Sequence, residues 1–149
     1  VAIERFFAEQ QLTPEISTEG GFRSYRAGGV QLLCGDMFRL TAGHLQGVKA
    51  VYDRASLVAL DRPQRLGYAS LLADILPPAA PILLVSMDYP EQQMQGPPHS
   101  VPETEVRELL GGRFSITRLH SLDLLQETGR YADRGLDRMW EHVYLLEPA

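Results

Sequence analysis

The chain has 149 residues, of which 44% are hydrophobic and 22% charged, and this composition suits one globular domain with a buried core rather than a disordered chain. Its net charge of -5 and the lack of any Lys or Arg run argue against a nucleic-acid partner, and no apolar stretch is long enough to predict a membrane span. The single cysteine, Cys34, excludes an internal disulfide framework and fits a reducing cytoplasm, where we expect the protein.

The chain opens with the pattern of an amphipathic helix, predicted from about Ala2 to Gln10, because its apolar residues fall on one helical stripe. Because the sequence opens inside a helix, we expect it to be a segment of a longer protein, and the alternative is a processed or simply short protein. A polar, glycine-rich stretch follows, with a short strand predicted at Phe22–Tyr25 and turns at its two Gly-Gly pairs. A further strand is predicted at Val30–Cys34, before Gly35 and Asp36 break the apolar run.

The middle of the chain contains the clearest helix. Apolar residues spaced i, i+3, i+4, i+7 and i+8 from Tyr68 to Leu76 form one face, and Asp61 with Gln64 makes a plausible capping box before them. Strands are predicted on both sides of this helix, at Val48–Asp53 and at Ile82–Val85. The second is an unbroken apolar run, which is typical of a strand covered on both faces.

The last third begins with a Gly/Pro loop over residues 93–102. A helix is predicted around residues 106–110, because Gly111-Gly112 stops the apolar pattern there. Strands are predicted at 114–118 and 140–146. Because strands and helices alternate, the sequence predicts an open, mostly parallel α/β sheet.

In such sheets, ligands bind beyond the carboxyl ends of the strands. That rule selects three predicted strand ends, Gly35-Asp36, Asp53-Arg54 and Asp88-Tyr89. Asp36 is a candidate acceptor for an amine edge or a hydroxyl group of a ligand, and Asp53 is a candidate for orienting Arg54. The alternative for each aspartate is a turn or helix cap, a common use of Asp where a strand ends.

Arg54 stands between two apolar segments, where a guanidinium needs partners. It is a candidate for binding a carboxylate or a thiolate, and the alternative is a structural ion pair with Asp53 or Asp88. Other chemistries lack their motifs. The four histidines and Cys34 show no metal-ligand spacing, Ser56 lacks the hydrolase elbow, and no phosphate-binding loop appears, so we expect no metal.

Two motifs stand together at a specific distance. They are Val51-Tyr52-Asp53-Arg54-Ala55, followed by an apolar stretch, and Gly96-Pro97-Pro98-His99-Ser100-Val101-Pro102. With these two motifs, the segments Ala2–Phe7, Cys34–Phe38, Asp88-Tyr89 and Glu141–Glu147 make the whole chain resemble the thiopurine S-methyltransferase family, including its bacterial members.

The resemblance implies a fold. It implies a Rossmann-like, class I methyltransferase that depends on S-adenosylmethionine, with residues 1–149 forming a single methyltransferase domain. Members of the family begin with further segments, among them a glycine loop that cradles the methionine end of the cofactor. We therefore expect the sequence to be the C-terminal portion of the family fold, with the N-terminal part missing.

The resemblance also implies roles for individual residues. Gly35 and Asp36 match cofactor-binding positions near the adenine, and Arg54 matches an active-site arginine close to both cofactor and substrate. Arg130 matches a second arginine that meets an anionic substrate. His99 stands where the family often has Phe, a departure that bears on the shape of the pocket.

The implied reaction is methyl transfer to the sulfur of a thiopurine or another small thiol, or to a selenium or tellurium compound. A thiol of low pKa needs no general base, only positive charge to hold its anion. The expected partner is a small-molecule thiol, and we expect the complete protein to be a monomer. The alternative from another class is a non-catalytic binding module, or an inactive fragment, on a methyltransferase scaffold.

Overall fold

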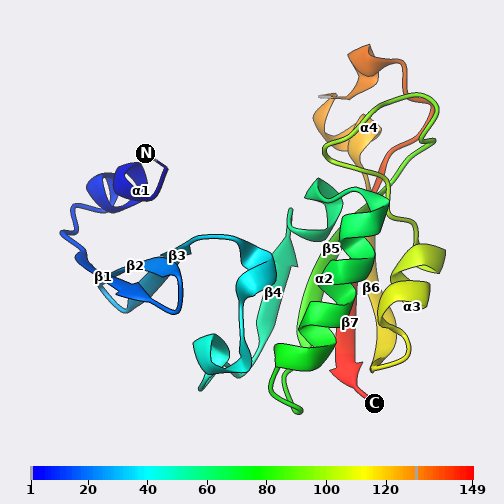
Figure 1. Ribbon diagram of the computed structural model, residues 1–149. Helices are drawn as coiled ribbons and strands as arrows, with labels where there is room; N and C mark the ends of the chain where they lie inside the picture. The colour runs from blue at the N-terminus through cyan, green and yellow to red at the C-terminus, as the bar shows by residue number, and fades with distance from the viewer. Residues whose placement is uncertain (1, 130) are drawn as a thin grey trace. The chain divides into compact units, whose positions relative to one another are not determined.

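A computed structural model describes residues 2–129 and 131–149, which divide into two compact units, residues 1–40 and residues 41–149 (Figure 1). Each unit contains helices and its own sheet, and in the second unit strands and helices alternate along the chain, so the α/β class is confirmed. Among the described residues, no helix is both long and apolar enough to span a membrane.

The first unit contains helix α1 (Ala2–Glu9) and a three-stranded sheet in the order β1-β2-β3. Both pairings in this sheet are antiparallel. The Gly-Gly pairs form the two turns between its strands, and all four glycines have positive φ, the backbone geometry that tight hairpins require. The strands are β1 (Glu15–Glu19), β2 (Phe22–Ala27) and β3 (Val30–Cys34).

Strands β2 and β3 confirm the predictions at Phe22–Tyr25 and Val30–Cys34, but β1 was missed. Four of the five β1 residues are exposed, so the strand carries no hydrophobic alternation that a sequence pattern could reveal. Phe22 and Tyr25 of β2 are buried, as is Phe7 of α1, while Phe6 is 36% exposed.

The second unit has a four-stranded sheet in the order β4-β5-β7-β6. The β4–β5 pairing is parallel, whereas β7 is antiparallel to both of its neighbours. Strands β4, β5 and β6 therefore point in one direction and β7 in the other. The strands are β4 (Val51–Arg54), β5 (Ile82–Asp88), β6 (Phe114–Asp123) and β7 (Trp140–Pro148).

The prediction of one mostly parallel sheet is wrong in two respects. Val30–Cys34 belongs to the antiparallel sheet of the first unit and not to the sheet that contains Asp53 and Arg54. In the second sheet, only one of the three pairings is parallel, because β7 lies between β5 and β6. The first error arises because a two-residue Gly-Gly turn joins strands that pair antiparallel, and the prediction did not take this into account.

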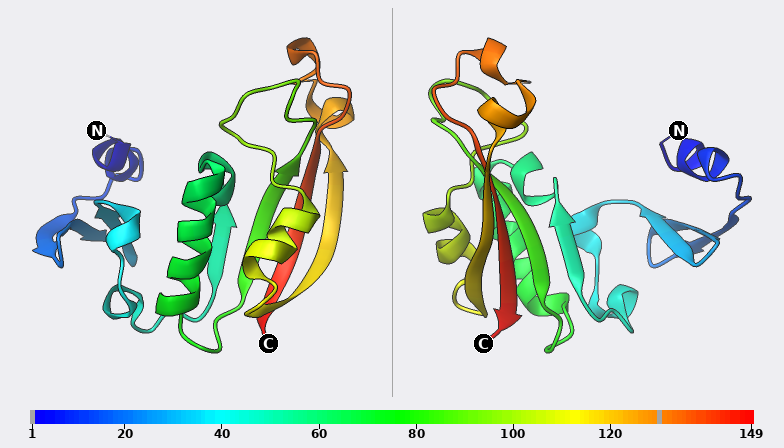
Figure 2. Two further views of the ribbon diagram at one scale, coloured as in Figure 1. Left: turned by 45° about the vertical axis from the view of Figure 1, so that its right-hand side comes forward. Right: turned by 180° about the vertical axis from the view of Figure 1, so that it is seen from behind.

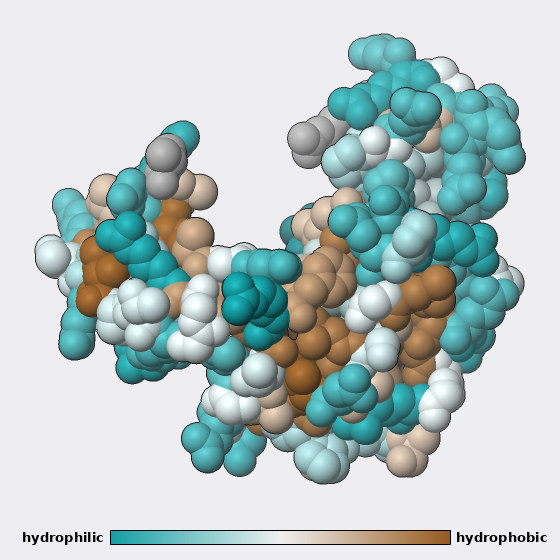
Figure 3. Space-filling model, viewed as in Figure 1, coloured by the Kyte–Doolittle hydropathy of each residue, from teal (hydrophilic) through white to brown (hydrophobic). Residues whose placement is uncertain are grey.

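Helices α2 (Arg62–Ile75) and α3 (Glu103–Leu110) lie on the same face of the four-stranded sheet (Figure 2). The predicted capping box is confirmed, since the Asp61 carboxylate accepts from the Gln64 amide and the Gln64 side chain accepts from the Asp61 amide. Hydrophobic residues gather around α2 in the space-filling view (Figure 3). The buried side chains of this layer include Leu72, Ile75, Ile82, Leu84, Val106, Tyr144 and Leu146.

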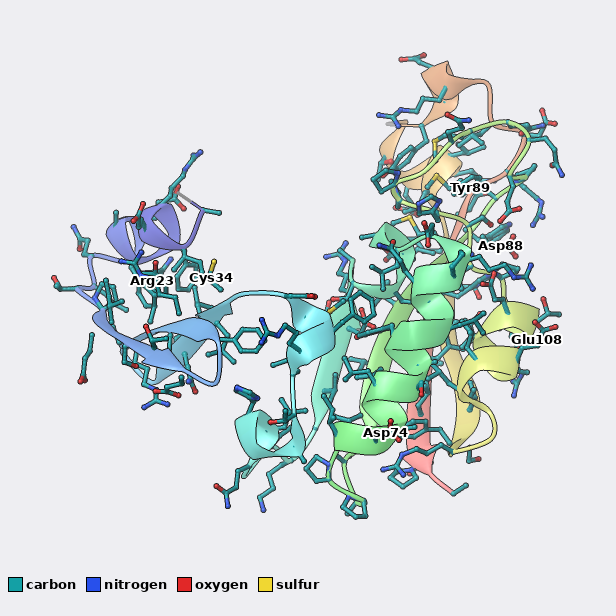
Figure 4. The ribbon with its side chains drawn as sticks, in the orientation of Figure 1. Arg23, Cys34, Asp74, Asp88, Tyr89 and Glu108 are labelled. Atoms are coloured by element: carbon teal, nitrogen blue, oxygen red, sulfur yellow. The ribbon has the colours of Figure 1, made fainter. Side chains whose placement is uncertain are left out.

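A smaller apolar cluster lies beyond the carboxyl ends of β5 and β6. Its buried members are Tyr89, Leu124, Leu136 and Met139. Leu124 begins the short helix α4 (Leu124–Thr128), which the sequence pattern did not reveal. Figure 4 labels Asp88, the last residue of β5, and Tyr89 of this cluster at the same end of the sheet.

Candidate functional site

The last two residues of β4, Asp53 and Arg54, have their side chains on opposite faces of the sheet, as consecutive strand residues do. Asp53 is 3% exposed. Arg54 has a side chain that is 61% exposed, and its guanidinium lies 3.6 Å from the carboxylate of Glu141 on β7. The alternative interpretation, an ion pair of Arg54 with Asp53 or Asp88, is therefore wrong, and Glu141 is a partner that the sequence did not identify.

Asp53 organises the turn that follows β4. One carboxylate oxygen accepts from the amides of Ser56 and Leu57, at 3.2 and 3.3 Å, and the other accepts from the Tyr68 hydroxyl at 2.9 Å. Burial raises the pKa of Asp53 above its ordinary value, and these hydrogen bonds oppose the shift. Burial and the neighbouring Asp53 charge also raise the pKa of Tyr68, which keeps its hydroxyl a donor.

A cavity of about 380 Å³ opens beside Arg54. Among the residues that the structure describes, Arg54 is the one charged residue in its wall, and the other wall residues are apolar. The cavity lies toward the carboxyl ends of β4 and β5, which agrees with the strand-end rule. Its wall is formed by Arg54, Ala55, Val58, Ala59, Val85, Met87, Pro97 and Pro98.

The Gly96–Pro102 loop forms one wall of this cavity and is held by hydrogen bonds at several points. The His99 amide donates to the Val58 carbonyl at 2.6 Å, and the Tyr89 hydroxyl donates to the Pro98 carbonyl at 2.7 Å. The Val101 amide donates to the Met87 carbonyl at 2.7 Å. The loop is thereby tied both to the turn after β4 and to β5.

His99 does not line the cavity beside Arg54. Its ring lies against Gly96, where an added Cβ would come 2.4 Å from the ring nitrogen Nδ1, and this close approach accounts for the glycine. His99 instead lines a separate, polar cavity of about 470 Å³ that also borders Arg65 and Tyr89.

The other predicted site residues lie elsewhere in the chain. Gly35 and Asp36 belong to the first unit, whereas Arg54 belongs to the second. Asp36 accepts from the Phe38 amide at 3.0 Å and caps a short 3-10 helix, as the alternative interpretation proposed. An added Cβ at Gly35 would lie 2.5 Å from the Phe22 ring, so packing requires this glycine. Arg130 lies outside the described residues.

Asp88 joins a second polar cluster on the sheet. It accepts from Arg138 at 3.1 Å, and its other oxygen lies 3.8 Å from Nε2 of His142. His142 is 6% exposed, and its Nδ1 lies 2.8 Å from the Ser121 hydroxyl. Burial lowers the pKa of His142, Asp88 and Glu103 oppose that shift, and Arg118 adds to it. In the part of the chain that the structure describes, His, Cys, Asp and Glu side chains nowhere gather in threes as a metal ion needs.

The lowered pKa of His142 predicts a pH-dependent stability. Below its unfolded pKa of about 6.5, the unfolded chain binds a proton that the folded chain resists, so stability falls as the pH drops from about 6.5 toward the lower folded pKa. We expect His142→Gln to flatten this slope, by at most about 1.4 kcal/mol per pH unit. Urea unfolding between pH 7 and pH 5 measures it, and equal slopes in variant and wild type would contradict the prediction.

Comparison with known proteins shows the family of this chain. The whole chain, residues 1–149, matches the family described as thiopurine S-methyltransferase (TPMT). The chain belongs to the thiopurine S-methyltransferase family. The two motifs that carried the resemblance both contribute to the cavity described above, one through Arg54 and Ala55 and the other through Pro97 and Pro98.

Individual members of the family are also similar over nearly all of this chain. A thiopurine S-methyltransferase of Azotobacter vinelandii is 43% identical over 146 residues, which are 98% of the chain and 67% of that protein. Those of Pseudomonas fluorescens and Pseudomonas paraeruginosa are 45% and 46% identical, over 97% and 98% of the chain and 66% and 67% of their own lengths. The chain thus spans about two thirds of the length of these relatives.

Proposed function

We propose that the protein transfers a methyl group from S-adenosylmethionine to the sulfur of a small thiol, as part of a class I, Rossmann-like methyltransferase domain. The observation that carries this proposal is the Arg54 guanidinium at the edge of a cavity whose other described wall residues are apolar. Membership of an S-methyltransferase family supports it. Thiopurines are the first substrates to consider, and small selenium and tellurium nucleophiles share the same chemistry.

The residues present suit an anionic sulfur nucleophile. Arg54 would hold the thiolate by charge and by its N–H groups, and a bound thiolate would replace Glu141 as its partner. The apolar wall formed by Val58, Val85 and Pro97 would exclude water. S-adenosylmethionine, when bound, supplies a methyl group already activated on a sulfonium sulfur. Alignment of the nucleophile is then the main task left to the protein.

Two further roles complete the proposal. Gly35 and Asp36 are proposed to contact the adenine of S-adenosylmethionine, as the family resemblance implies. Arg130 is proposed to meet the negative charge of the substrate, as the family resemblance implies.

The experiment that tests the proposal mixes the purified protein with S-adenosylmethionine and 6-mercaptopurine and measures the S-methylated product by mass spectrometry. Adenine, which carries an amino group in place of the sulfur, is the matched control and should stay unmodified. We expect product only with the thiol. Binding of S-adenosylhomocysteine in a calorimeter without any methyl transfer would instead favour the non-catalytic binding module.

A further inference from the structure

The placement of Arg54 depends on its backbone more than on contacts of its side chain. Among the described residues, its guanidinium has one charged neighbour, Glu141, at 3.6 Å, which is longer than a good hydrogen bond. The Arg54 backbone is fixed from two sides. It pairs with Val85 in the parallel ladder, and the next residue, Ala55, turns the chain with φ 81°, a conformation uncommon outside glycine.

Asp53 and Tyr68 hold that turn in place. The Asp53 carboxylate accepts from two amides of the turn through one oxygen and from the Tyr68 hydroxyl through the other. Tyr68 is 6% exposed and belongs to α2, so the turn is attached to the helix that packs on the sheet. A carboxylate accepts on both sides at once, whereas an amide side chain has only one oxygen to offer.

The same contacts extend to the opposite wall of the cavity. The two amides that Asp53 binds lead into a 3-10 helix, η3 (Leu57–Ala59). The carbonyl of Val58 in this helix accepts from the His99 amide at 2.6 Å, next to Pro97 and Pro98 of the cavity wall. Hydrogen bonds, together with the backbone of residues 56–58, therefore connect α2 through the turn to both sides of the cavity.

We propose that Asp53 and Tyr68 are positioning residues for methyl transfer, which act by holding the turn that presents Arg54 to the cavity. This role rests on the proposed function. Neither side chain lines the cavity, and neither is expected to touch the substrate. The inference specifies how Asp53, the sequence candidate for orienting Arg54, would act, and it adds Tyr68 of α2 to the residues required for activity.

Tyr68→Phe tests the role, because it removes one hydroxyl and little volume. We expect kcat/KM for 6-mercaptopurine to fall roughly 10- to 100-fold at 25 °C, as misplaced catalytic groups do, with native circular dichroism retained. Asp53→Asn should act in the same direction. Tyr144→Phe is the matched control, since Tyr144 is fully buried and its hydroxyl has no partner among the described residues. It should keep wild-type kcat/KM.

A double variant shows whether Tyr68 acts through Arg54. In an Arg54→Ala background, Tyr68→Phe should change kcat/KM by less than about twofold, because the group it positions is gone. A further loss of the full size in that background would overturn the inference. So would a folded Tyr68→Phe protein that keeps wild-type kcat/KM, because a merely structural tyrosine would lower only the melting temperature.

Hydrogen exchange gives a readout that does not depend on methyl transfer. The Ser56 and Leu57 amides should exchange faster in Tyr68→Phe than in wild type or Tyr144→Phe, and unchanged exchange would overturn the inference. Absence of transfer by the wild-type protein would refute the proposed function instead. In that case, faster exchange would leave Asp53 and Tyr68 as supports of the turn alone, and the positioning role would be overturned.

Discussion

Arg54→Ala is expected to lower kcat/KM for methyl transfer roughly 100- to 1000-fold, equal to about 2.7–4 kcal/mol of transition-state stabilisation, without unfolding the protein. The reason is that Arg54 is the one charged residue in the cavity wall within the described part of the chain. Its side chain is 61% exposed, so its removal leaves no cavity in the core. Initial rates with 6-mercaptopurine, together with a urea unfolding curve, measure both effects.

Two further variants separate charge from geometry at this position. Arg54→Lys keeps the charge and loses the planar fork of donors, so we expect activity between that of wild type and that of the alanine variant. Arg118→Ala is the control, because Arg118 is half-exposed and pairs with Glu103 at 2.9 Å away from the cavity wall. Near-normal kcat/KM in Arg54→Ala would remove Arg54 from the site.

Arg65→Met is expected to cost about 3–5 kcal/mol of stability, a large share of the ~5–15 kcal/mol that holds a typical domain folded. The Arg65 guanidinium on α2 lies 2.8 Å from the Glu105 carboxylate on α3 and also donates to the Leu60 carbonyl. Both side chains are at most 10% exposed. Removing the arginine leaves a buried carboxylate without its counter-charge.

The matched control lies three residues away on the same helix. The Arg62 and Glu108 side chains are 70% and 68% exposed and lie 3.8 Å apart, so Arg62→Ala should cost only ~0–1 kcal/mol. The double variant Arg65→Met/Glu105→Leu should recover much of the loss, since no charge is then left buried. Urea unfolding of the four proteins decides the matter, and equal costs for Arg65→Met and Arg62→Ala would contradict the argument.

Local patterns predicted most individual elements. The helix preceded by Asp61 is confirmed. It could be predicted because its capping residues and its apolar face lie close together in the sequence. The strand predicted at Val48–Asp53 is displaced in the structure to Val51–Arg54, because the Val48 amide closes the preceding turn on the Leu45 carbonyl. The boundary of a strand depends on whether its first amides bond within a turn or to a neighbouring strand, and the pattern of apolar residues does not indicate which of the two forms.

The candidate site was predicted in part. Arg54 and the Gly96–Pro102 loop were identified from the sequence, and the cavity unites them. Glu141 and Tyr68 were not identified as site residues, because each meets its partner through tertiary packing alone. The assignments of Gly35, Asp36 and Arg130 to the cofactor and substrate stay predictions.

The sequence by itself determined the family, the α/β class and the arginine that defines the cavity, because these depend on local motifs and on their spacing. Only the tertiary structure decided that Val30–Cys34 pairs within an antiparallel sheet and that β7 lies reversed between β5 and β6. Every strand offers the same backbone donors and acceptors, so a strand pattern does not specify its neighbour. Burial and the intervening turns make that choice, and they also bring Glu141 to Arg54 and Tyr68 to Asp53.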